Sequence, residues 1–555
     1  MSTTTRGSQK TQEDADRDLS AGGRISRGWL LIVLVFVAGS ASLAVELSAS
    51  RLLAPYFGTS LFVWANLIGL ILLYLTVGYY VGGRVADRYP HPAALYGITA
   101  VAALLISAIP PLSRPILTWS LSAFATYSVG VFYGSLVSVI LLFAIPTILL
   151  GCVSPYAIRL RIDQVGRSGR TSGMLYAIST GGSIVGTFLP VLVLIPDIGT
   201  YRTFLVFGAV LLLVSIIGLM LSSGRIQKPG APGMPGKRPA KGLLSILLII
   251  PMLLTLLGVQ GPIKPASGTG NGGRLLTERE SVYNYMQVVR AGNETQLILN
   301  EGLGIHSIYN PDNVLTQGPW DYFMVAPFFN NPPFTPSQVH RVCIIGLGAG
   351  TIPREFTAAY GPLPIDGVEI DQSIVDMGRQ YFHMNEPNLH VIVQDGRYFL
   401  RTTPQRYDII GLDAYQQPYI PFQLTTTEFL HEVRAHLTPT GVVVMNVGRT
   451  SSDFRLVDAM ARNLHSVFPN VYIIDSLRFA NSLVIATNTP TKLANFQLNT
   501  YPITNPMLQI VASESISNGN MREEHQAQVL FTDDRAPIEQ LIDTIIFSVV
   551  QRGKS

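Results

Sequence analysis

The chain has 555 residues, of which 48% are hydrophobic and only 13% are charged, with a mean hydropathy of +0.33. This length exceeds one ordinary domain, and the apolar residues concentrate in the first half. The net charge of +4 is small, and its Lys and Arg lie between apolar runs, so we expect no nucleic-acid partner. The two cysteines, Cys152 and Cys343, support neither a disulfide framework nor a cysteine metal site.

Residues 1–28 are polar and rich in Ser, Thr and Gly, so we predict a disordered cytoplasmic tail. Apolar runs follow, each close to the ~20 residues that a helix needs to cross a bilayer. They lie at 29–50, 61–83, 92–110, 128–150, 173–195, 203–222 and 242–260. The sequence therefore predicts a transmembrane helical domain at 29–260 with six or seven helices, in a multi-pass protein of the cell membrane.

Basic residues alternate between loops in a way that predicts orientation. Arg and Lys cluster after the second, fourth and sixth runs, whereas the opposite loops carry little beyond Arg51, Arg114 and Arg202. The positive-inside rule then places the N-terminus in the cytoplasm. The run 242–260 leaves the side of the C-terminal half open, because a full span would put that half outside and an interfacial segment would keep it inside.

Glu46 is an ionisable residue within the first apolar run. A charge inside a bilayer is costly, so Glu46 is a functional candidate, although a position near the helix end or a pair with Arg51 would also explain it. Residues 82–88, GGRVADR, resemble the short cytoplasmic turn of major-facilitator transporters. A transporter or sensor regulated by the C-terminal half is therefore an alternative reading.

Residues 261–273 predict a linker rich in Pro, Gly and Ser, and 274–335 a β-rich lead-in with a turn at Gly292 and Asn293. The segment 336–555 has the pattern of an α/β Rossmann-like domain. Its first strand ends at GLGAG, residues 346–350, where glycines allow a ligand to approach the backbone and a helix begins.

Three further strand ends carry acidic residues. Glu369 ends the second strand, where such folds present a carboxylate to ribose hydroxyls. Asp395 and Gly396 follow the third strand and can contact an adenine edge, and Asp413 follows the fourth. The carboxyl ends of parallel strands meet at one edge of a sheet, so this order predicts an adenosine-type ligand there.

With these motifs in view, residues 275 to about 490 resemble the spermidine synthase (polyamine aminopropyltransferase) family, which has a class I methyltransferase-like fold. VEID at 368–371, DGRYFL at 395–400 and LTTTEFL at 424–430 carry the resemblance. The complete chain resembles the membrane-fused branch of that family. The resemblance implies a transferase that uses decarboxylated S-adenosylmethionine and a polyamine such as putrescine, without a permanently bound cofactor or a metal.

The resemblance also implies roles for single residues. Asp413 would orient the attacking amine and help to deprotonate it. From their position directly after Asp413, we expect Tyr415 and Gln416 to line the acceptor pocket. The donor would be held by Gly346, Gly348, Gly350, Glu369, Asp395 and Gly396.

Departures from the family pattern leave the reaction open. Ala349 stands where the family usually has an Asp that grips the donor's amine, and Gln416 stands where it has a second catalytic Asp. Losing these carboxylates favours intact S-adenosylmethionine, so methyl transfer or lyase cleavage is an alternative. We expect a small-molecule amine or other acceptor, the lipid bilayer and a homodimer as partners. An adenosylated co-substrate is made in the cytosol, so we favour the cytoplasmic side for this domain.

Overall fold

The computed structural model describes residues 6–58, 61–124, 130–162, 168–222, 261–267, 273–300, 302, 304–415, 420–542 and 544–545. The chain divides into a helical unit that ends at Ile263 and an α/β unit that starts at Lys264. This division falls within 261–273, the segment for which the sequence predicts a linker.

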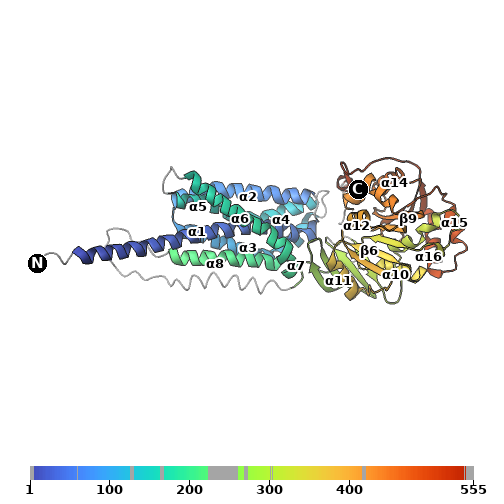
Figure 1. Ribbon diagram of the computed structural model, residues 1–555, viewed down its shortest axis with the longest axis horizontal. Helices are drawn as coiled ribbons and strands as arrows, with labels where there is room; N and C mark the ends of the chain where they lie inside the picture. The colour runs from blue at the N-terminus through green and yellow to red at the C-terminus, as the bar shows by residue number, and fades with distance from the viewer. Residues whose placement is uncertain are drawn as a thin grey trace. The chain divides into compact units, whose positions relative to one another are not determined.

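The helical unit contains six stretches, among the described residues, that are long and apolar enough to cross a membrane. They match the first six predicted runs, and the seventh run, 242–260, lies outside the described residues. The elements (Figure 1) are α1 (Arg6–Phe57), α2 (Leu61–Arg88), α3 (Pro92–Phe124), α4 (Gly130–Gly151), α5 (Val153–Arg161), α6 (Ser168–Leu189), a π-helical turn η2 (Pro190–Leu194), α7 (Ile195–Ile198) and α8 (Thr200–Ser222).

The start of α1 corrects one prediction. The helix begins at Arg6, so residues 6–28 extend the first apolar helix where the sequence predicted a disordered tail. Adding residues to an existing helix requires no new nucleation, and this segment contains good helix formers such as Gln, Lys, Glu and Arg.

Small residues bring α1 and α6 into backbone contact. A Cβ atom added at Gly182 would lie 2.0 Å from the carbonyl oxygen of Phe36, and one added at Gly186 would lie 2.0 Å from that of Ser40. Ser183 Oγ also donates a hydrogen bond to the Gly39 carbonyl at 3.3 Å. Close packing of this kind is typical of helices that associate in lipid, where no hydrophobic effect drives them together.

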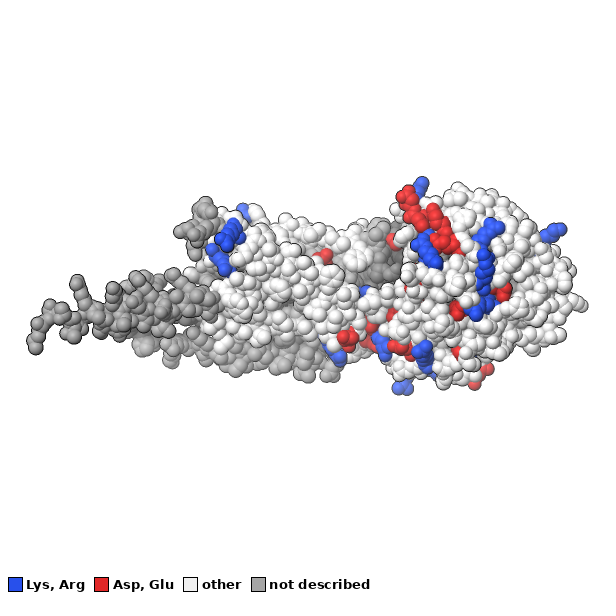
Figure 2. Space-filling model, viewed as in Figure 1, with Lys and Arg blue, Asp and Glu red and all other residues white. Residues whose placement is uncertain are grey.

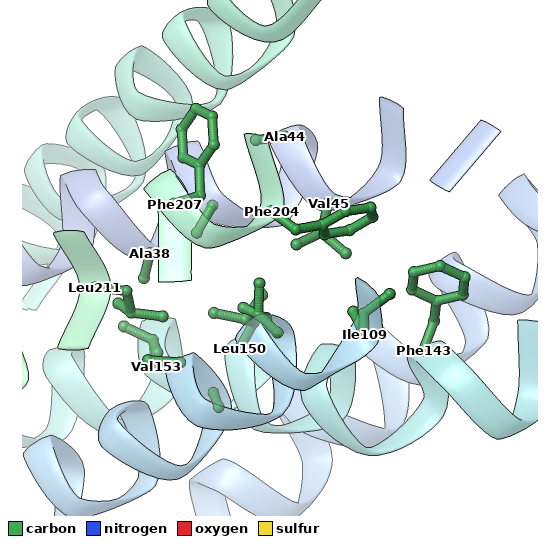
Figure 3. Close-up of a cluster of buried hydrophobic side chains, with 14 of the residues drawn as sticks. Ala38, Ala44, Val45, Ile109, Phe143, Leu150, Val153, Phe204, Phe207 and Leu211 are labelled. Atoms are coloured by element: carbon green, nitrogen blue, oxygen red, sulfur yellow. The ribbon is translucent and has the colours of Figure 1, made fainter. Parts of the chain in front are cut away.

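The interior of the helical unit is mostly apolar, with uncharged Ser, Thr and Asn side chains among its buried residues. Figure 3 shows Val45 of α1, Ile109 of α3, Phe143 of α4 and Phe204 of α8 gathered in one cluster, and Phe143 and Phe204 stack with ring centroids 6.3 Å apart. On the face shown in Figure 2, charged side chains are sparse along the described part of this unit and frequent on the α/β unit. This contrast suits a bilayer for the first unit and water for the second.

The α/β unit opens with a four-stranded antiparallel sheet, the predicted lead-in. Its strands pair in chain order and are β1 (Arg274–Glu280), β2 (Tyr285–Ala291), β3 (Glu294–Leu299) and β4 (Ile305–Tyr309). The 3-10 helix η3 (Pro319–Phe329) follows, and every one of its residues is buried. The end of the predicted β-rich segment is thus helical and belongs to the core of the next layer, because its apolar side chains contact the large sheet.

The large sheet has the order β12-β10-β11-β9-β8-β5-β6-β7. Its strands β5 to β9 are parallel and the remaining ones antiparallel. They are β5 (Val342–Ile345), β6 (Ile365–Glu369), β7 (Leu389–Val393), β8 (Tyr407–Leu412), β9 (Leu437–Gly448), β10 (Asn470–Asp475), β11 (Asn481–Thr487) and β12 (Met521–Glu524). After β5, the chain adds β6 and β7 on one side of this strand and then β8 on its other side. Folds of this kind bind ligands between the two strands where the order reverses, here β5 and β8.

Helices cover both faces of this sheet. Cys343 and Ile345 of β5 face a core shared with α12 (Gly396–Thr402), α13 (Thr427–Ala435) and α14 (Arg455–His465). Val342 and Ile344 face the opposite core, with η3, α10 (Thr351–Tyr360), α15 (Asn495–Thr500) and α16 (Pro506–Ile516). Further along the sheet, α11 (Gln372–Tyr381) packs with β6. The predicted fold class, apolar helices followed by a Rossmann-like domain with a β lead-in, is confirmed.

Candidate active site

The glycine turn after β5 forms as the sequence predicts. Gly346, Gly348 and Gly350 all have positive φ, at +88°, +56° and +91°. A Cβ atom at Gly346 would lie 2.5 Å from the carbonyl carbon of Asp413, so glycine at this position allows the ends of β5 and β8 to touch. A Cβ atom at Gly350 would instead meet Met384, which makes the role of this third glycine one of packing at the start of α10.

Glu369 lies beside this turn at the end of β6. Its Oε2 accepts a 2.9 Å hydrogen bond from the Gly348 N–H, and its Oε1 accepts one of 3.2 Å from the Asp371 N–H. Burial raises the pKa of the Glu369 carboxyl to about 7, and these two N–H groups oppose the rise. The carboxylate therefore stands where the sequence predicts it, already anchored to the glycine turn.

Asp395 and Gly396 stand at the same edge of the sheet, after β7. Asp395 caps α12, because its Oδ1 accepts the Tyr398 N–H at 2.9 Å. A Cβ atom at Gly396 would lie 2.3 Å from Ile345 Cγ2, so this glycine lets α12 approach the end of β5. The residues predicted to bind the adenosine-type ligand thus lie together at the carboxyl ends of β5, β6 and β7.

Asp413 follows β8 and is half-buried. Its Oδ2 accepts a 2.9 Å hydrogen bond from Trp320 Nε1, and its Oδ1 accepts one of 2.8 Å from Asn446 Nδ2. Burial raises the pKa of Asp413 to about 7, and the two donors lower it. A carboxyl that titrates near neutral pH is suited to taking up or giving a proton.

Tyr415 comes two residues after Asp413, and its side chain reaches β9. Its hydroxyl donates a 2.8 Å hydrogen bond to the carbonyl oxygen of Asn446. Burial first, and Asp413 second, raise the pKa of Tyr415 above its usual range, so it is neutral at pH 7. Gln416, the other predicted pocket residue, lies outside the described residues.

The lead-in sheet contributes to the turn as well. Ser307 of β4 accepts the Ala349 N–H on its Oγ at 2.8 Å. Ala349 itself is 2% exposed and packs in an apolar cluster with Ile374 and Met377 of α11. The position where the family has an amine-gripping carboxylate is therefore apolar.

Trp320, Asn446 and Ser307 are residues of this edge that the sequence analysis did not identify. Asn446 gave a sequence signal, because it is a polar residue directly after the apolar run 442–445. It lies inside β9 and is level with Asp413, since Leu412 pairs with Met445. Trp320 lies in η3, and no pattern of neighbouring residues in the sequence predicted its position at this edge.

Arg397, from the DGRYFL motif, belongs to an ion cluster with Asp533 and Glu432. Its guanidinium donates to Asp533 at 2.7 Å and 2.8 Å and to Glu432 at 2.8 Å. Asp533 thus ties the C-terminal segment to α12 through a salt bridge.

Comparison with known proteins agrees with these motifs. The model of the spermine/spermidine synthase domain matches residues 328–483, which include β5 to β9. A probable polyamine aminopropyl transferase of Bifidobacterium longum is 33% identical over 293 residues, 49% of this chain and 64% of the relative. A polyamine aminopropyltransferase of Vibrio vulnificus is 36% identical over 136 residues, 24% of this chain and 44% of the relative. The chain thus spans less than two thirds of the length of these curated relatives.

A solved structure described as a probable spermidine synthase from Corynebacterium glutamicum is similar at 18% identity and a TM-score of 0.37, covering 49% of this chain and 99% of that one. The fold class rests on the strand order described above, and the family rests on the domain match and the sequence relatives. The C-terminal part of this chain therefore carries a spermine/spermidine synthase domain.

Proposed function

We propose that the protein is a membrane-bound aminopropyltransferase that moves an aminopropyl group from decarboxylated S-adenosylmethionine to an amine such as putrescine. The observation that carries this proposal is the close approach of Gly346 to Asp413 where the neighbouring strands β5 and β8 end. It joins a turn suited to a nucleoside with a carboxyl suited to proton transfer. We further propose that the six apolar helices cross the cell membrane with the N-terminus in the cytoplasm.

The donor would lie across the carboxyl ends of β5, β6 and β7. Glu369 would accept hydrogen bonds from the ribose hydroxyls, and Gly346 and Gly348 would leave room for the thioether portion. Asp395 and Gly396 would contact the adenine. Because the two carboxylate oxygens of Glu369 accept hydrogen bonds from the N–H groups of Gly348 and Asp371, the carboxylate is oriented before the donor substrate binds.

The proposed aminopropyl transfer requires one acid-base residue. The nitrogen lone pair of a neutral amine attacks the methylene carbon next to the sulfonium, a C–N bond forms, and the C–S bond breaks with its electron pair going to sulfur. Methylthioadenosine leaves as a neutral thioether, and Asp413 accepts the proton that the product nitrogen loses. The negative charge of Asp413 also stabilises the positive charge that develops on the amine.

Purified full-length protein, in detergent or nanodiscs, tests this proposal. Incubation with decarboxylated S-adenosylmethionine and putrescine should give methylthioadenosine and spermidine in equal amounts. Consumption of neither this donor nor S-adenosylmethionine, with any of a panel of amines, would overturn it.

Ala349 favours a second candidate function, methyl transfer from intact S-adenosylmethionine. This residue leaves the donor's amino-acid end without a carboxylate contact at that position, and an intact donor carries a carboxylate that an Asp there would repel. The same incubation separates the two, because methyl transfer yields S-adenosylhomocysteine. Lyase cleavage would yield methylthioadenosine without any acceptor present.

A further inference from the structure

Two uncharged side chains hold the carboxylate of Asp413, one on each oxygen. Trp320 Nε1 donates to Oδ2 at 2.9 Å and Asn446 Nδ2 donates to Oδ1 at 2.8 Å. We propose that Trp320 and Asn446 are positioning residues for Asp413, which fix the rotation of its carboxylate and stabilise its ionised form. The inference rests on the proposed function, in which Asp413 takes up the proton of the attacking amine.

The indole of Trp320 is held rigidly by its surroundings. Its side chain is 3% exposed, and its ring lies edge-on to Phe479 with centroids 6.0 Å apart. A Cβ atom at Gly318 would lie 2.9 Å from Trp320 Cε3, so the preceding loop closes directly on the ring. The direction of the N–H group is therefore set by packing and not by the ligand.

The neighbouring Asp321 fixes the loop that leads into Trp320. Its Oδ1 accepts hydrogen bonds from the N–H of Thr316 at 3.0 Å and from the hydroxyl of Thr316 at 2.6 Å, and its Oδ2 accepts the Gln317 N–H at 2.9 Å. These bonds hold Gln317 at its φ of +58°. The loop thus brings a donor from η3 to a carboxylate 93 residues later in the chain.

The amide of Asn446 is oriented by a second asparagine. Asn481 Nδ2, from the adjacent strand β11, donates to Asn446 Oδ1 at 2.9 Å. Because the Asn446 oxygen accepts this bond, its NH₂ group faces Asp413. Asn446 is 5% exposed, so its donor is available to Asp413 without competition from bulk water.

The pKa of Asp413 shows why these two hydrogen bonds matter. Burial raises the pKa of Asp413 to about 7, and the only groups among the described residues that lower it are Asn446 and Trp320. No charged side chain of the described part of the chain takes part in this balance, and Tyr415, the titratable neighbour, is neutral at pH 7. Each carboxylate oxygen keeps a free lone pair to accept the amine proton.

The pH dependence of turnover tests the proposal. Trp320→Phe keeps an aromatic ring but removes the N–H, and Asn446→Leu keeps the approximate side-chain volume. Each should move the acidic limb of the profile of kcat/KM against pH upward by about one unit, so that the rate falls about fivefold at pH 7 and recovers at pH 9. A loss of equal size at every pH, with the limb in place, would mean that the residue is only structural and would overturn the proposal.

Tyr472→Phe is a matched control. It also removes one buried hydrogen-bonding group from the same unit, a hydroxyl 2.8 Å from the Thr491 hydroxyl, but Tyr472 has no hydrogen bond with Asp413. Its acidic limb should coincide with that of the wild type. Donor affinity, measured by titration calorimetry on each full-length variant, shows whether the α/β unit is still folded.

A spectroscopic titration separates this inference from the proposed function. The emission of Trp320, taken as the difference between wild type and Trp320→Phe, should change in one step near pH 7 and lose that step in Asp413→Asn. If the wild type turns over no donor, the proposed function fails while this step still shows the contact. A step that persists in Asp413→Asn, or no step at all in the wild type, would overturn the inference.

Discussion

Glu369 Oε2 accepts a 2.9 Å hydrogen bond from the backbone N–H of Gly348, and this bond ties the end of β6 to the glycine turn after β5. The carboxylate is thereby held over the place where two parallel strands end side by side, with Ile345 opposite Val368. Its burial, with 7% of the residue exposed, makes the negative charge costly when no ligand is bound. The burial of this negative charge should therefore have a measurable effect on the stability of the α/β unit.

Glu369→Gln should stabilise the α/β unit at high pH. The pKa of Glu369 is raised from 4.5 to about 7, so the native state binds this proton more tightly than the unfolded chain, and stability falls as pH rises from about 4.5 to 7. The Glu369→Gln variant has no titrating group at this position, so its stability does not fall over this pH range. Its free energy of unfolding should exceed that of the wild type by on the order of 3 kcal/mol at pH 8 and match it below pH 4.5.

Thermal unfolding of the full-length protein at pH 4.5, 6 and 8 measures this difference. Donor affinity should change in the opposite direction, falling roughly tenfold or more, because the ribose would lose a charged acceptor. A pH-independent difference in unfolding temperature would show that Glu369 is not the titrating group.

Gly346→Ala should damage the site more than it damages the fold. The added methyl group would lie 2.5 Å from the carbonyl carbon of Asp413 and must displace that residue. Gly361→Ala is the matched control, since Gly361 has a similar φ of +80° and no atom within 4 Å of the added methyl group. Both variants should lose about 1 kcal/mol of stability through backbone strain, but only Gly346→Ala should lose donor binding and turnover. Equal donor affinity in the two variants would contradict the contact with Asp413.

Gly182→Ala should destabilise the helical unit, whereas Gly181→Ala should not. The methyl group at 182 would meet the Phe36 carbonyl oxygen at 2.0 Å, and the one at 181 has no atom within 4 Å. We expect a cost of about 1–3 kcal/mol for the first substitution, as for other overpacked contacts. The loss of monodisperse protein on heating in detergent, followed by size-exclusion chromatography, compares the two. Similar profiles would mean that α1 and α6 are not in backbone contact.

Asp413→Asn and Glu46→Gln separate an enzyme from a transporter. The enzyme reading expects Asp413→Asn to lower turnover by about 10²–10⁴-fold, because an amide cannot accept the proton, and Glu46→Gln to leave turnover within about twofold. Product formation by the two full-length variants measures both effects. The opposite pattern, with function lost only in Glu46→Gln, would support a transporter or sensor whose α/β unit is regulatory.

The apolar helices and the sheet edge that carries the glycine turn could both be predicted from local patterns. Apolar runs of spanning length became α1 to α8, and the strand-to-glycine pattern at 342–350 became β5 and its turn. Residues 6–28 show the limit of this reasoning, since polar composition suggested disorder where α1 simply continues. Residues 319–329 show another limit, because the burial of η3 depends on the sheet that it packs against.

By itself, the sequence determined that Glu369, Asp395 and Asp413 would stand at the ends of parallel strands, because strand period, strand end and glycine turn are properties of neighbouring residues. Only the tertiary structure decided what surrounds them. The partners of Asp413 come from η3 and β9, and the orientation of Asn446 comes from β11. Contacts of this kind arise when distant segments pack together, and the proton affinity of Asp413 is set by those contacts and by the burial that they create.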